Sequence, residues 1–221
     1  MVIKFIVGLD LGQAQDYTAL SILERLPGKE YAYHVRHLER CRGRSYPDIV
    51  DKVFTMMHSP ALDGNAVLVV DQTGVGAPVV DMFGKVGLKP IGIFIHGGDK
   101  TSNEGSTWRV PKRSLVGVLQ VLLQTDRLKV ASRLPLGPVL SQEMLNFKCK
   151  IDPVTAHDSY SAWREADHDD LVLSVAMAAW FGERSRPKPI PRFVQPAQIS
   201  VGGGARYVGN CDYPNLTWSG Q

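Results

Sequence analysis

Four aspartates lie where apolar runs of the chain begin or end. Asp10 follows "FIVGL", Asp71 ends "AVLVVD", and Asp169 and Asp170 open "DDLVLSVAMAAW". Carboxylates that are brought together repel one another, so a cluster of them is costly unless cations neutralise it. All-oxygen ligation suits hard divalent cations. These residues therefore predict a site for Mg²⁺ or Mn²⁺.

A pair of such ions, about 3.5–4 Å apart, clamps the attacking and leaving oxygens of a phosphodiester during hydrolysis. Gly8 and Gly12 flank Asp10, and we expect them to leave room for metal and phosphate beside the backbone. Each aspartate also has an ordinary structural interpretation, as a turn former at a strand end or as a helix N-cap. Their occurrence together, in this order of strands and helix, favours the metal site.

The elements that must position these aspartates follow from the hydrophobic pattern. Apolar runs with short connections predict three antiparallel strands, at 3–11, 17–26 and 30–38. Helical spacing then alternates with short β-branched runs. The pattern predicts helices at 46–59, 76–87, 111–124, 136–147 and 168–184. It predicts further strands at 65–71, 89–97 and 127–131, a polar glycine-rich loop at 97–109, and a hairpin within 147–163.

This order predicts an α/β fold with a mixed central sheet, in which antiparallel strands precede parallel ones and helices cover both faces. The strands that end near Asp10 and at Asp71 become parallel neighbours, so their C-terminal ends meet at one edge of the sheet. Ligands of open α/β sheets bind at such edges. A proline-rich and glycine-rich stretch follows Arg184, which predicts a domain at 1–184 and an extended tail at 185–221.

Composition argues against several classes of protein. The three cysteines, Cys41, Cys149 and Cys211, form no C-x-x-C pair, which disfavours structural zinc and a disulfide framework and favours a reducing compartment. No basic-then-apolar leader opens the chain and no apolar run reaches about 18 residues, so we expect neither secretion nor a membrane span. The phosphate-loop pattern G-x-x-x-x-G-K-[ST] is absent, which excludes a P-loop ATPase.

Two groups of basic residues are candidates for contact with the phosphate backbone of a nucleic acid. Arg42 and Arg44 lie in "HVRHLERCRGR", and Arg109, Lys112 and Arg113 lie around the start of the helix expected at 111–124. The net charge of +3 permits such binding without requiring it. A solvated surface is the alternative for any one of these side chains.

The segments "VGLDLGQAQDYTAL", "VLVVDQTGVGAPVVDMF" and "HDDLVLSVAMAAW" resemble the nuclease domain of phage large terminases, a branch of the ribonuclease H-like nucleases. The resemblance covers nearly all of residues 3–183. It implies a ribonuclease H-like fold and cutting of double-stranded DNA with two ions, Mg²⁺ or Mn²⁺, during genome packaging. It also implies that Asp10, Asp71 and Asp169 are catalytic metal ligands.

Which aspartate of the helix binds metal is not decided by spacing. On a helix, Asp169 shares a face with the apolar residues Val172 and Ala176, and Asp170 shares a neighbouring face with Leu173 and Met177. The resemblance favours Asp169, with Asp170 as a secondary ligand.

The resemblance further implies a set of partners and a location. The partners are double-stranded DNA, a terminase ATPase motor, a small terminase subunit and a portal, in the cytoplasm of an infected bacterial host. A complete large terminase carries its ATPase motor ahead of the nuclease, whereas this sequence starts at the nuclease. We therefore expect no ATP-driven translocation from these residues.

Three other functions remain open at this point. "GLDLGQAQDYTALSI" is also similar to the first phosphate motif of the actin and sugar-kinase superfamily, whose members bind ATP between two such domains. A Holliday-junction resolvase of the same fold would use the same acidic cluster on branched DNA. A DNA-binding module without catalytic activity would cut nothing.

Overall fold

An eight-stranded mixed sheet forms the centre of the computed structural model, which describes residues 3–12, 16–74, 76–147 and 169–185. The strands are β1 (Phe5–Asp10), β2 (Tyr17–Leu26), β3 (Ala32–Arg42), β4 (Ala66–Asp71), β5 (Ile91–His96), β6 (Ser102–Glu104), β7 (Thr107–Pro111) and β8 (Leu128–Val130). The helices are α1 (Tyr46–Met57), α2 (Gly76–Lys85), α3 (Lys112–Gln124), α4 (Gly137–Asn146) and α5 (Asp170–Arg184). The strand order across the sheet is β6-β7-β5-β4-β1-β2-β3-β8.

The first three strands form the predicted antiparallel unit, because β1 pairs with β2 and β2 pairs with β3. The prediction that β1 and β4 are parallel neighbours is also confirmed. The third strand runs to Arg42, beyond the expected end at residue 38, because β2 offers it partners as far as Tyr17.

The polar stretch at 97–109 is not the loop that its composition predicted. It contains β6 and the start of β7, which pair antiparallel across Gly105, a residue with a φ of 60°. The side-chain amide of Asn103 donates to the carbonyl oxygens of Gly105 and Thr107 and closes the turn. Backbone pairing with β5 extends the sheet here, although the side chains are polar.

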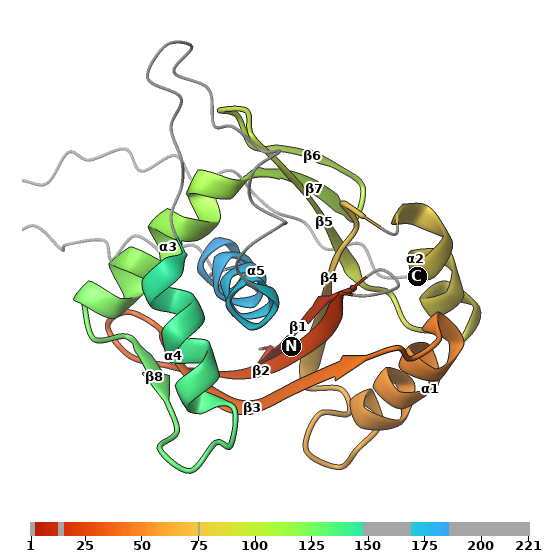
Figure 1. Ribbon diagram of the computed structural model, residues 1–221, viewed down its shortest axis with the longest axis horizontal. Coiled ribbons are helices and arrows are strands. Elements are labelled where there is room, and N and C mark those ends of the chain that lie inside the picture. The colour runs from red at the N-terminus through yellow and green to blue at the C-terminus, as the bar shows by residue number, and fades with distance from the viewer. Residues whose placement is uncertain (1–2, 13–15, 75, 148–168, 186–221) are drawn as a thin grey trace, which may run out of the picture. The chain divides into compact units, whose positions relative to one another are not determined.

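The helices cover the two faces of the sheet in two groups (Figure 1). On one face, α3, α4 and α5 pack over a core that includes Ile6, Val69 and Leu115. On the other face, α1 and α2 pack over a core that includes Val7, Leu68 and Phe83. The predicted α/β fold with a mixed sheet and helices on both faces is therefore confirmed.

The surroundings of α5 explain why that helix is apolar over most of its surface. It lies between the sheet and the pair α3 and α4 (Figure 1), and ten of its residues are buried. None of the described helices is both long enough and apolar enough to cross a bilayer. The hairpin predicted within 147–163 and the tail beyond 185 fall almost entirely outside the described residues, so both remain predictions.

Candidate functional site

Asp10 and Asp71 end two neighbouring parallel strands, β1 and β4. Leu9 and Val70 are partners in the register, so the aspartates that follow them lie side by side at the C-terminal edge of the sheet. Leu9 and Val70 belong to the core beneath α1 and α2. Because successive side chains of a strand point to opposite faces, both carboxylates lie on the α5 face. Asp10 is only 8% exposed.

The carboxylate of Asp71 also organises the turn after β4. Its Oδ1 accepts hydrogen bonds from the backbone N–H of Thr73 at 2.7 Å and from the Thr73 hydroxyl at 2.5 Å. The Thr73 hydroxyl oxygen in turn accepts the N–H of Ile95 in β5 at 2.8 Å. The turn-forming role that was the ordinary interpretation of this residue is therefore real, and it holds the carboxylate in one orientation.

The helix α5 crosses β1 in backbone contact at Gly8. A Cβ added to Gly8 would lie 2.0 Å from the carbonyl oxygen of Ser174. The role predicted for Gly8 was therefore wrong, because α5 fills the space that we expected to admit metal and phosphate. The role predicted for Gly12 was also wrong, because the start of β2 fills the space there: an added Cβ would lie 2.5 Å from the carbonyl oxygen of Tyr17.

The direction of α5 brings its first residues to the carboxylates. Near its C-terminal end, a Cβ on Gly182 would meet Ile6, at the start of β1, so the helix runs opposite to β1. Asp170 lies about 6 Å before Ser174 along the helix. Asp10 lies about 6.6 Å beyond the Gly8 contact along the strand. The N-terminal end of α5 therefore reaches the level of Asp10.

The two aspartates at the start of α5 form ion pairs with basic side chains from opposite flanks of the central strands. Lys112, directly after β7, donates from Nζ to Oδ2 of Asp169 at 2.9 Å. Arg40, on β3, donates to Oδ2 of Asp170 at 2.6 Å. In the strand order, β7 and β3 lie on either side of the central pair β4 and β1. Both carboxylates are thus neutralised by basic side chains in this structure.

Glu143 of α4 is a further residue of the site that the sequence did not single out. Its Oε2 accepts the backbone N–H of Val172 in the first turn of α5 at 2.9 Å, and its side chain is almost fully buried. Its Oε1 lies 3.6 Å from the Arg40 guanidinium. The signal was a carboxylate on the apolar stripe of a helix, since Leu140 and Phe147, on the same side of the helix, are buried hydrophobics.

The surroundings of Glu143 change its acidity. Burial raises the pKa of this carboxyl from 4.5 to about 7, although the hydrogen bond from Val172 and the charge of Arg40 act in the opposite direction. The neighbouring charge of Asp170 contributes to this rise in the pKa. Glu143 therefore changes its protonation state near neutral pH.

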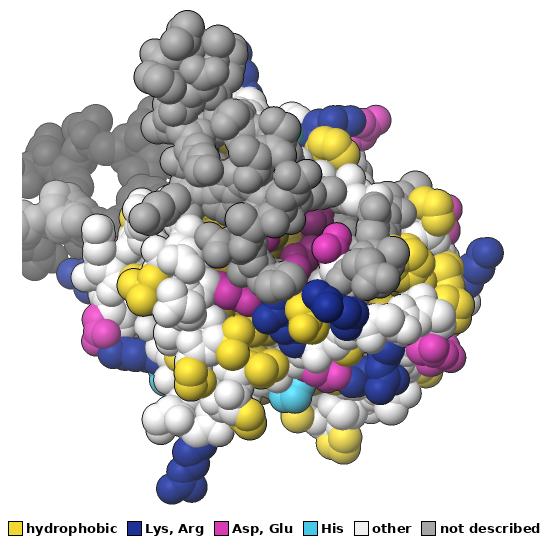
Figure 2. All heavy atoms as spheres, in the orientation of Figure 1, with side chains coloured by type: hydrophobic (Ala, Val, Ile, Leu, Met, Phe, Trp, Pro, Cys, Tyr) yellow, Lys and Arg dark blue, Asp and Glu magenta, His cyan; other side chains and the backbone are white. Residues whose placement is uncertain are grey.

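The acidic residues meet at one sheet edge without forming a complete metal-binding group. Figure 2 shows Asp and Glu side chains gathered around the end of α5, with Lys and Arg side chains beside them. Within 3–12, 16–74, 76–147 and 169–185, no three Asp, Glu, His or Cys side chains lie close enough together to hold a metal ion. Metal ligation by Asp10, Asp71, Asp169 and Asp170 therefore remains a prediction.

Among the residues predicted to contact DNA, Arg42 ends β3 and Arg44 follows it. Arg42 is the cross-strand partner of Tyr17, and its guanidinium stacks 4.1 Å from the Tyr17 ring centre. This pair stands two register positions beyond the pair of Ala19 and Arg40, and Ala19 pairs with Asp10. Both arginines are exposed.

The remaining predicted DNA contacts differ in their surroundings. Arg109 is exposed on β7, with its guanidinium 5.0 Å from the Phe94 ring centre. Arg113 forms an ion pair with Asp99 at 2.6 Å. Lys112 is mostly buried and engaged with Asp169. A role in DNA binding remains a prediction for all of them.

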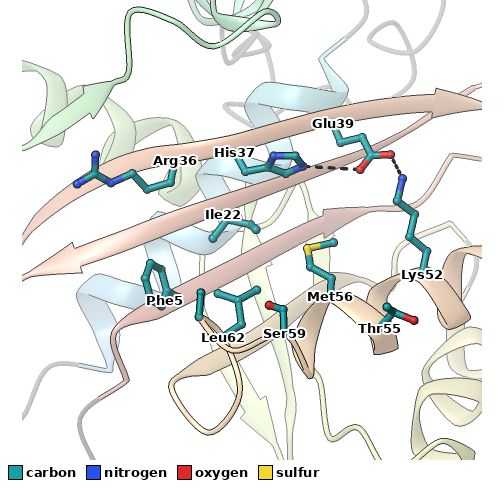
Figure 3. A pocket seen from close by; sticks show the side chains of 11 residues that line it. Phe5, Ile22, Arg36, His37, Glu39, Lys52, Thr55, Met56, Ser59 and Leu62 are labelled. Atoms are coloured by element: carbon teal, nitrogen blue, oxygen red, sulfur yellow. Dashed lines mark hydrogen bonds and ion pairs between the residues drawn. The ribbon is translucent and has the colours of Figure 1, made fainter.

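A cavity of about 620 Å³ lies on the other face of the sheet, between α1 and the strands β1 to β3 (Figure 3). Its walls are largely apolar, with Phe5, Ile22 and Met56 among them. Among the described residues, Glu39 is the one carboxylate that lines it, and it is engaged by His37 at 3.7 Å and by Lys52. The cavity therefore lacks the paired carboxylates that the sheet edge offers.

The sequence matches no protein-family model and no curated protein. Solved structures do match the fold. The large terminase nuclease from thermophilic phage G20c is 22% identical, with a TM-score of 0.54 over 79% of this chain and 80% of that one. The nuclease domain of the large terminase subunit gp2 of bacterial virus Sf6 is 12% identical, with a TM-score of 0.56 over 80% of this chain and 87% of that one.

A third match carries a metal ion. The nuclease domain of the large terminase of bacteriophage SPP1, with bound Mn, is 16% identical, with a TM-score of 0.50 over 83% of this chain and 87% of that one. At such identities the comparison concerns the fold. The chain has the ribonuclease H-like fold of these nuclease domains, so the resemblance seen in the sequence is confirmed at that level.

Proposed function

We propose that this chain, which has the ribonuclease H-like fold of large terminase nuclease domains, is a divalent-metal-dependent endonuclease that cuts double-stranded DNA. One observation carries the proposal. Asp10 and Asp71 lie side by side on the α5 face, and Gly8 lets α5 approach so closely that Asp169 and Asp170 reach the same edge. Carboxylates from three separate elements thus come to one end of the central strands.

The donor set fits Mg²⁺ or Mn²⁺ by its chemistry, because every candidate ligand is a carboxylate oxygen. Asp10, Asp71 and Asp169 would hold the ions, with Asp170 as a secondary ligand. When bound, two ions activate a water for attack on phosphorus and stabilise the charge on the leaving oxygen. The Mn bound by the SPP1 nuclease domain supports this choice of metal.

Lys112 has two roles in this proposal. It neutralises Asp169 in the absence of metal, at a distance of 2.9 Å. If Asp169 held a divalent ion, the Lys112 ammonium would no longer be needed to neutralise this carboxylate and could contact the phosphates of a DNA strand at the same edge. Metal binding and DNA binding would thus support each other through one side chain.

The remaining basic residues would hold the duplex. Arg42 ends β3 at the edge of the sheet that carries the carboxylates, and Arg44 follows it in the chain. Both side chains are exposed. Arg109 and Arg113 lie beyond the other side of the central strands, on β7 and α3. Contacts to phosphate position DNA without reading its sequence, so we expect cutting with little sequence preference.

The biological role that fits this activity is cutting of double-stranded DNA during phage genome packaging. Its partners would then be a terminase ATPase motor, a small terminase subunit and a portal, in the cytoplasm of an infected bacterium. The similarity to the G20c and Sf6 terminase nuclease structures supports this part of the proposal through the fold alone.

The test is a plasmid cleavage assay. We expect purified protein to nick or linearise supercoiled plasmid with Mn²⁺ or Mg²⁺ and to lose this activity in EDTA. Asp10→Asn should be inactive, whereas Asp81→Asn, on the exposed side of α2, should cut like the parent. Cleavage that persists in excess chelator would contradict the metal mechanism.

Two alternative functions are outcomes of the same experiment. A strong preference for four-way junctions over linear duplex would favour a resolvase. Tight binding of ATP without any cleavage would favour a domain of the actin and sugar-kinase type.

A further inference from the structure

Within the described residues, the helix that brings Asp169 and Asp170 to the sheet edge is not capped by its own N-cap side chain. Asp169 occupies the N-cap position, but its side chain makes no capping hydrogen bond to the helix. Its carboxylate is directed to Lys112 instead. The first N–H groups of an α-helix have no partner within the helix, so they need one from outside.

Glu143 supplies that partner from α4. Its Oε2 accepts the Val172 N–H at 2.9 Å, in the first turn of α5, and the side chain is 6% exposed. A carboxylate at this end of a helix also meets the positive end of the helix dipole. The α5 N-terminus is therefore capped by a residue of another helix, in the interior of the protein.

Arg40 connects this cap to the sheet. Its guanidinium reaches Asp170 at 2.6 Å and Glu143 at 3.6 Å, and it stacks 3.8 Å from the Tyr17 ring centre. Through β2, Arg40 also stands in the same cross-strand row as Asp10, since both residues pair with Ala19. The start of α5 is thus tied to the row of strands that carries the Asp10 carboxylate.

The two aspartates at the start of α5 differ in how firmly they are held. Asp170 is held towards β3 by a short, mostly buried ion pair, and Arg40 is tied to Glu143 as well. Asp169 is held by Lys112, and it is the more exposed of the two side chains. Releasing Asp169 therefore disturbs fewer contacts than releasing Asp170.

We propose that Glu143 and Arg40 are positioning residues of the nuclease site: together they fix the start of α5 and keep Asp170 on its β3 side, so that Asp169 is the main metal ligand at this end of α5. This inference rests on the proposed function for its catalytic part. Loss of a residue that orients metal ligands typically lowers metal affinity or activity about 10–100-fold.

The first test compares Glu143→Ala, which removes the acceptor, with Glu143→Gln, which keeps an oxygen for the Val172 N–H. We expect Glu143→Ala to raise the Mn²⁺ concentration for half-maximal plasmid cleavage at least about tenfold. Glu143→Gln should stay within about threefold of the parent, because the amide oxygen still caps the helix. Leu140→Ala, a fully buried position on the same face of α4, is the control for general loss of stability.

The outcomes separate positioning from simple structural support. Leu140→Ala should lower the unfolding midpoint and leave the Mn²⁺ dependence unchanged. If Glu143→Ala behaves like Leu140→Ala in both measurements, Glu143 is only a packing residue and the inference is overturned. Equal loss in Glu143→Gln and Glu143→Ala would also overturn it, because the cap would then not be the cause.

A second test addresses the aspartates. We expect Asp169→Ala to abolish cleavage and Asp170→Ala to raise the Mn²⁺ requirement about tenfold, as Glu143→Ala does. If Asp170→Ala is inactive and Asp169→Ala is active, Asp170 is the main metal ligand and the inference is overturned.

A third measurement does not depend on activity. Amide hydrogen exchange should become faster in the first turn of α5 in Glu143→Ala, while the last turn, near Arg184, keeps the rate of the parent. Unchanged exchange in the first turn would refute the positioning role even if the protein cuts DNA. If the parent protein cuts no DNA with any metal, the proposed function fails, and faster exchange in Glu143→Ala would still support the structural part of the inference.

Discussion

Replacing Gly8 by alanine is the most direct test of how the sheet and α5 are brought together. The added Cβ would lie 2.0 Å from the carbonyl oxygen of Ser174, 2.9 Å from its carbonyl carbon and 3.0 Å from Oγ of Ser21. The first two atoms belong to the backbone of a buried helix, so neither can turn aside as the end of a side chain would. The substitution therefore requires α5 to move away from β1.

The size of the effect follows from the overlap. Ordinary van der Waals contact begins near 3.4 Å, so the helix must retreat by about 1.4 Å at this point. Overpacking of a well-packed core costs about 1–3 kcal/mol, and a clash with backbone belongs at the upper end of that range. We expect Gly8→Ala to lower the free energy of unfolding by about 3 kcal/mol, or roughly 6–12 °C in Tm for a domain of this size.

The assay is urea denaturation of the parent and two variants, followed by circular dichroism. Gly84→Ala is the matched control, because Gly84 is an exposed residue of α2 and an added Cβ there would meet nothing within 4 Å. Alanine is a better helix former than glycine, so Gly84→Ala should gain about 0.5–1 kcal/mol. The two substitutions add the same methyl group and should shift the midpoint in opposite directions.

A Gly8→Ala protein as stable as Gly84→Ala, with an unchanged denaturant slope, would refute this account of the helix contact. A destabilised Gly8→Ala protein that keeps the Mn²⁺ requirement of the parent would refute the expectation that the position of α5 controls metal binding. It would show that the start of α5 can move without disturbing the metal ligands.

Four other results are expected. Asp10→Asn should abolish cleavage while the metal-free protein keeps or gains stability, because it removes a buried carboxylate from an acidic cluster; thermal unfolding beside Asp81→Asn checks this, and clear destabilisation would contradict it. Arg42→Ala should weaken DNA binding alike for different sequences and reduce the salt slope of log K by about 1; a sequence-dependent loss would argue against a phosphate contact. Because the folded-state pKa of Glu143 is raised to about 7 from 4.5, its contribution to stability is full below the lower value and is lost as pH rises through the higher one; Glu143→Gln should remove this part of the pH dependence, and an unchanged profile would contradict the raised pKa. A chain that stops at Ser185 should fold and cut DNA, since the proline-rich tail has few apolar residues to bury; insoluble protein would show that the tail is needed.

Much of the fold could be predicted because the core strands are continuous apolar runs and because the connections between them determine how they pair. β1 and β4 are apolar runs flanked by helices or short turns, and parallel pairing follows from the helical connection between antiparallel and parallel parts. The edge where Asp10 and Asp71 meet follows from that pairing alone. The mixed α/β sheet was therefore predictable from the order of strands and helices, and the ribonuclease H-like fold was implied by the family resemblance of the three acidic segments.

The hairpin of β6 and β7 could not be predicted from composition. Its residues, such as Ser102, Asn103 and Glu104, are polar and exposed, so they show no period-two pattern of burial. The strands form because the edge of β5 offers backbone groups to β7, and β7 offers its other edge to β6. Pairing of this kind is decided by neighbours in space and leaves little trace in the side chains.

The role expected for the glycines beside Asp10 was wrong, and Glu143 was not singled out, for a different reason. Small residues near a predicted site are compatible with a ligand and equally with a second backbone, and only the structure shows that α5 lies against Gly8. Glu143 belongs to a helix that carries none of the predicted ligands, so its link to Val172 depends on tertiary packing. Contacts between distant elements are the part of a site that local patterns cannot supply.

The buried position of α5 has a consequence for synthesis of the protein. The strands β1 to β3 leave the ribosome well before the helix that covers them, and 130 residues separate Arg40 from Asp170. At about 5–20 residues per second, this delay is roughly 7–26 s. During that interval the α5 face of the sheet is exposed to water and open to chaperones or to mispairing. The acidic edge is completed only when α5 arrives, so the site of the proposed nuclease would form only after α5 has been made.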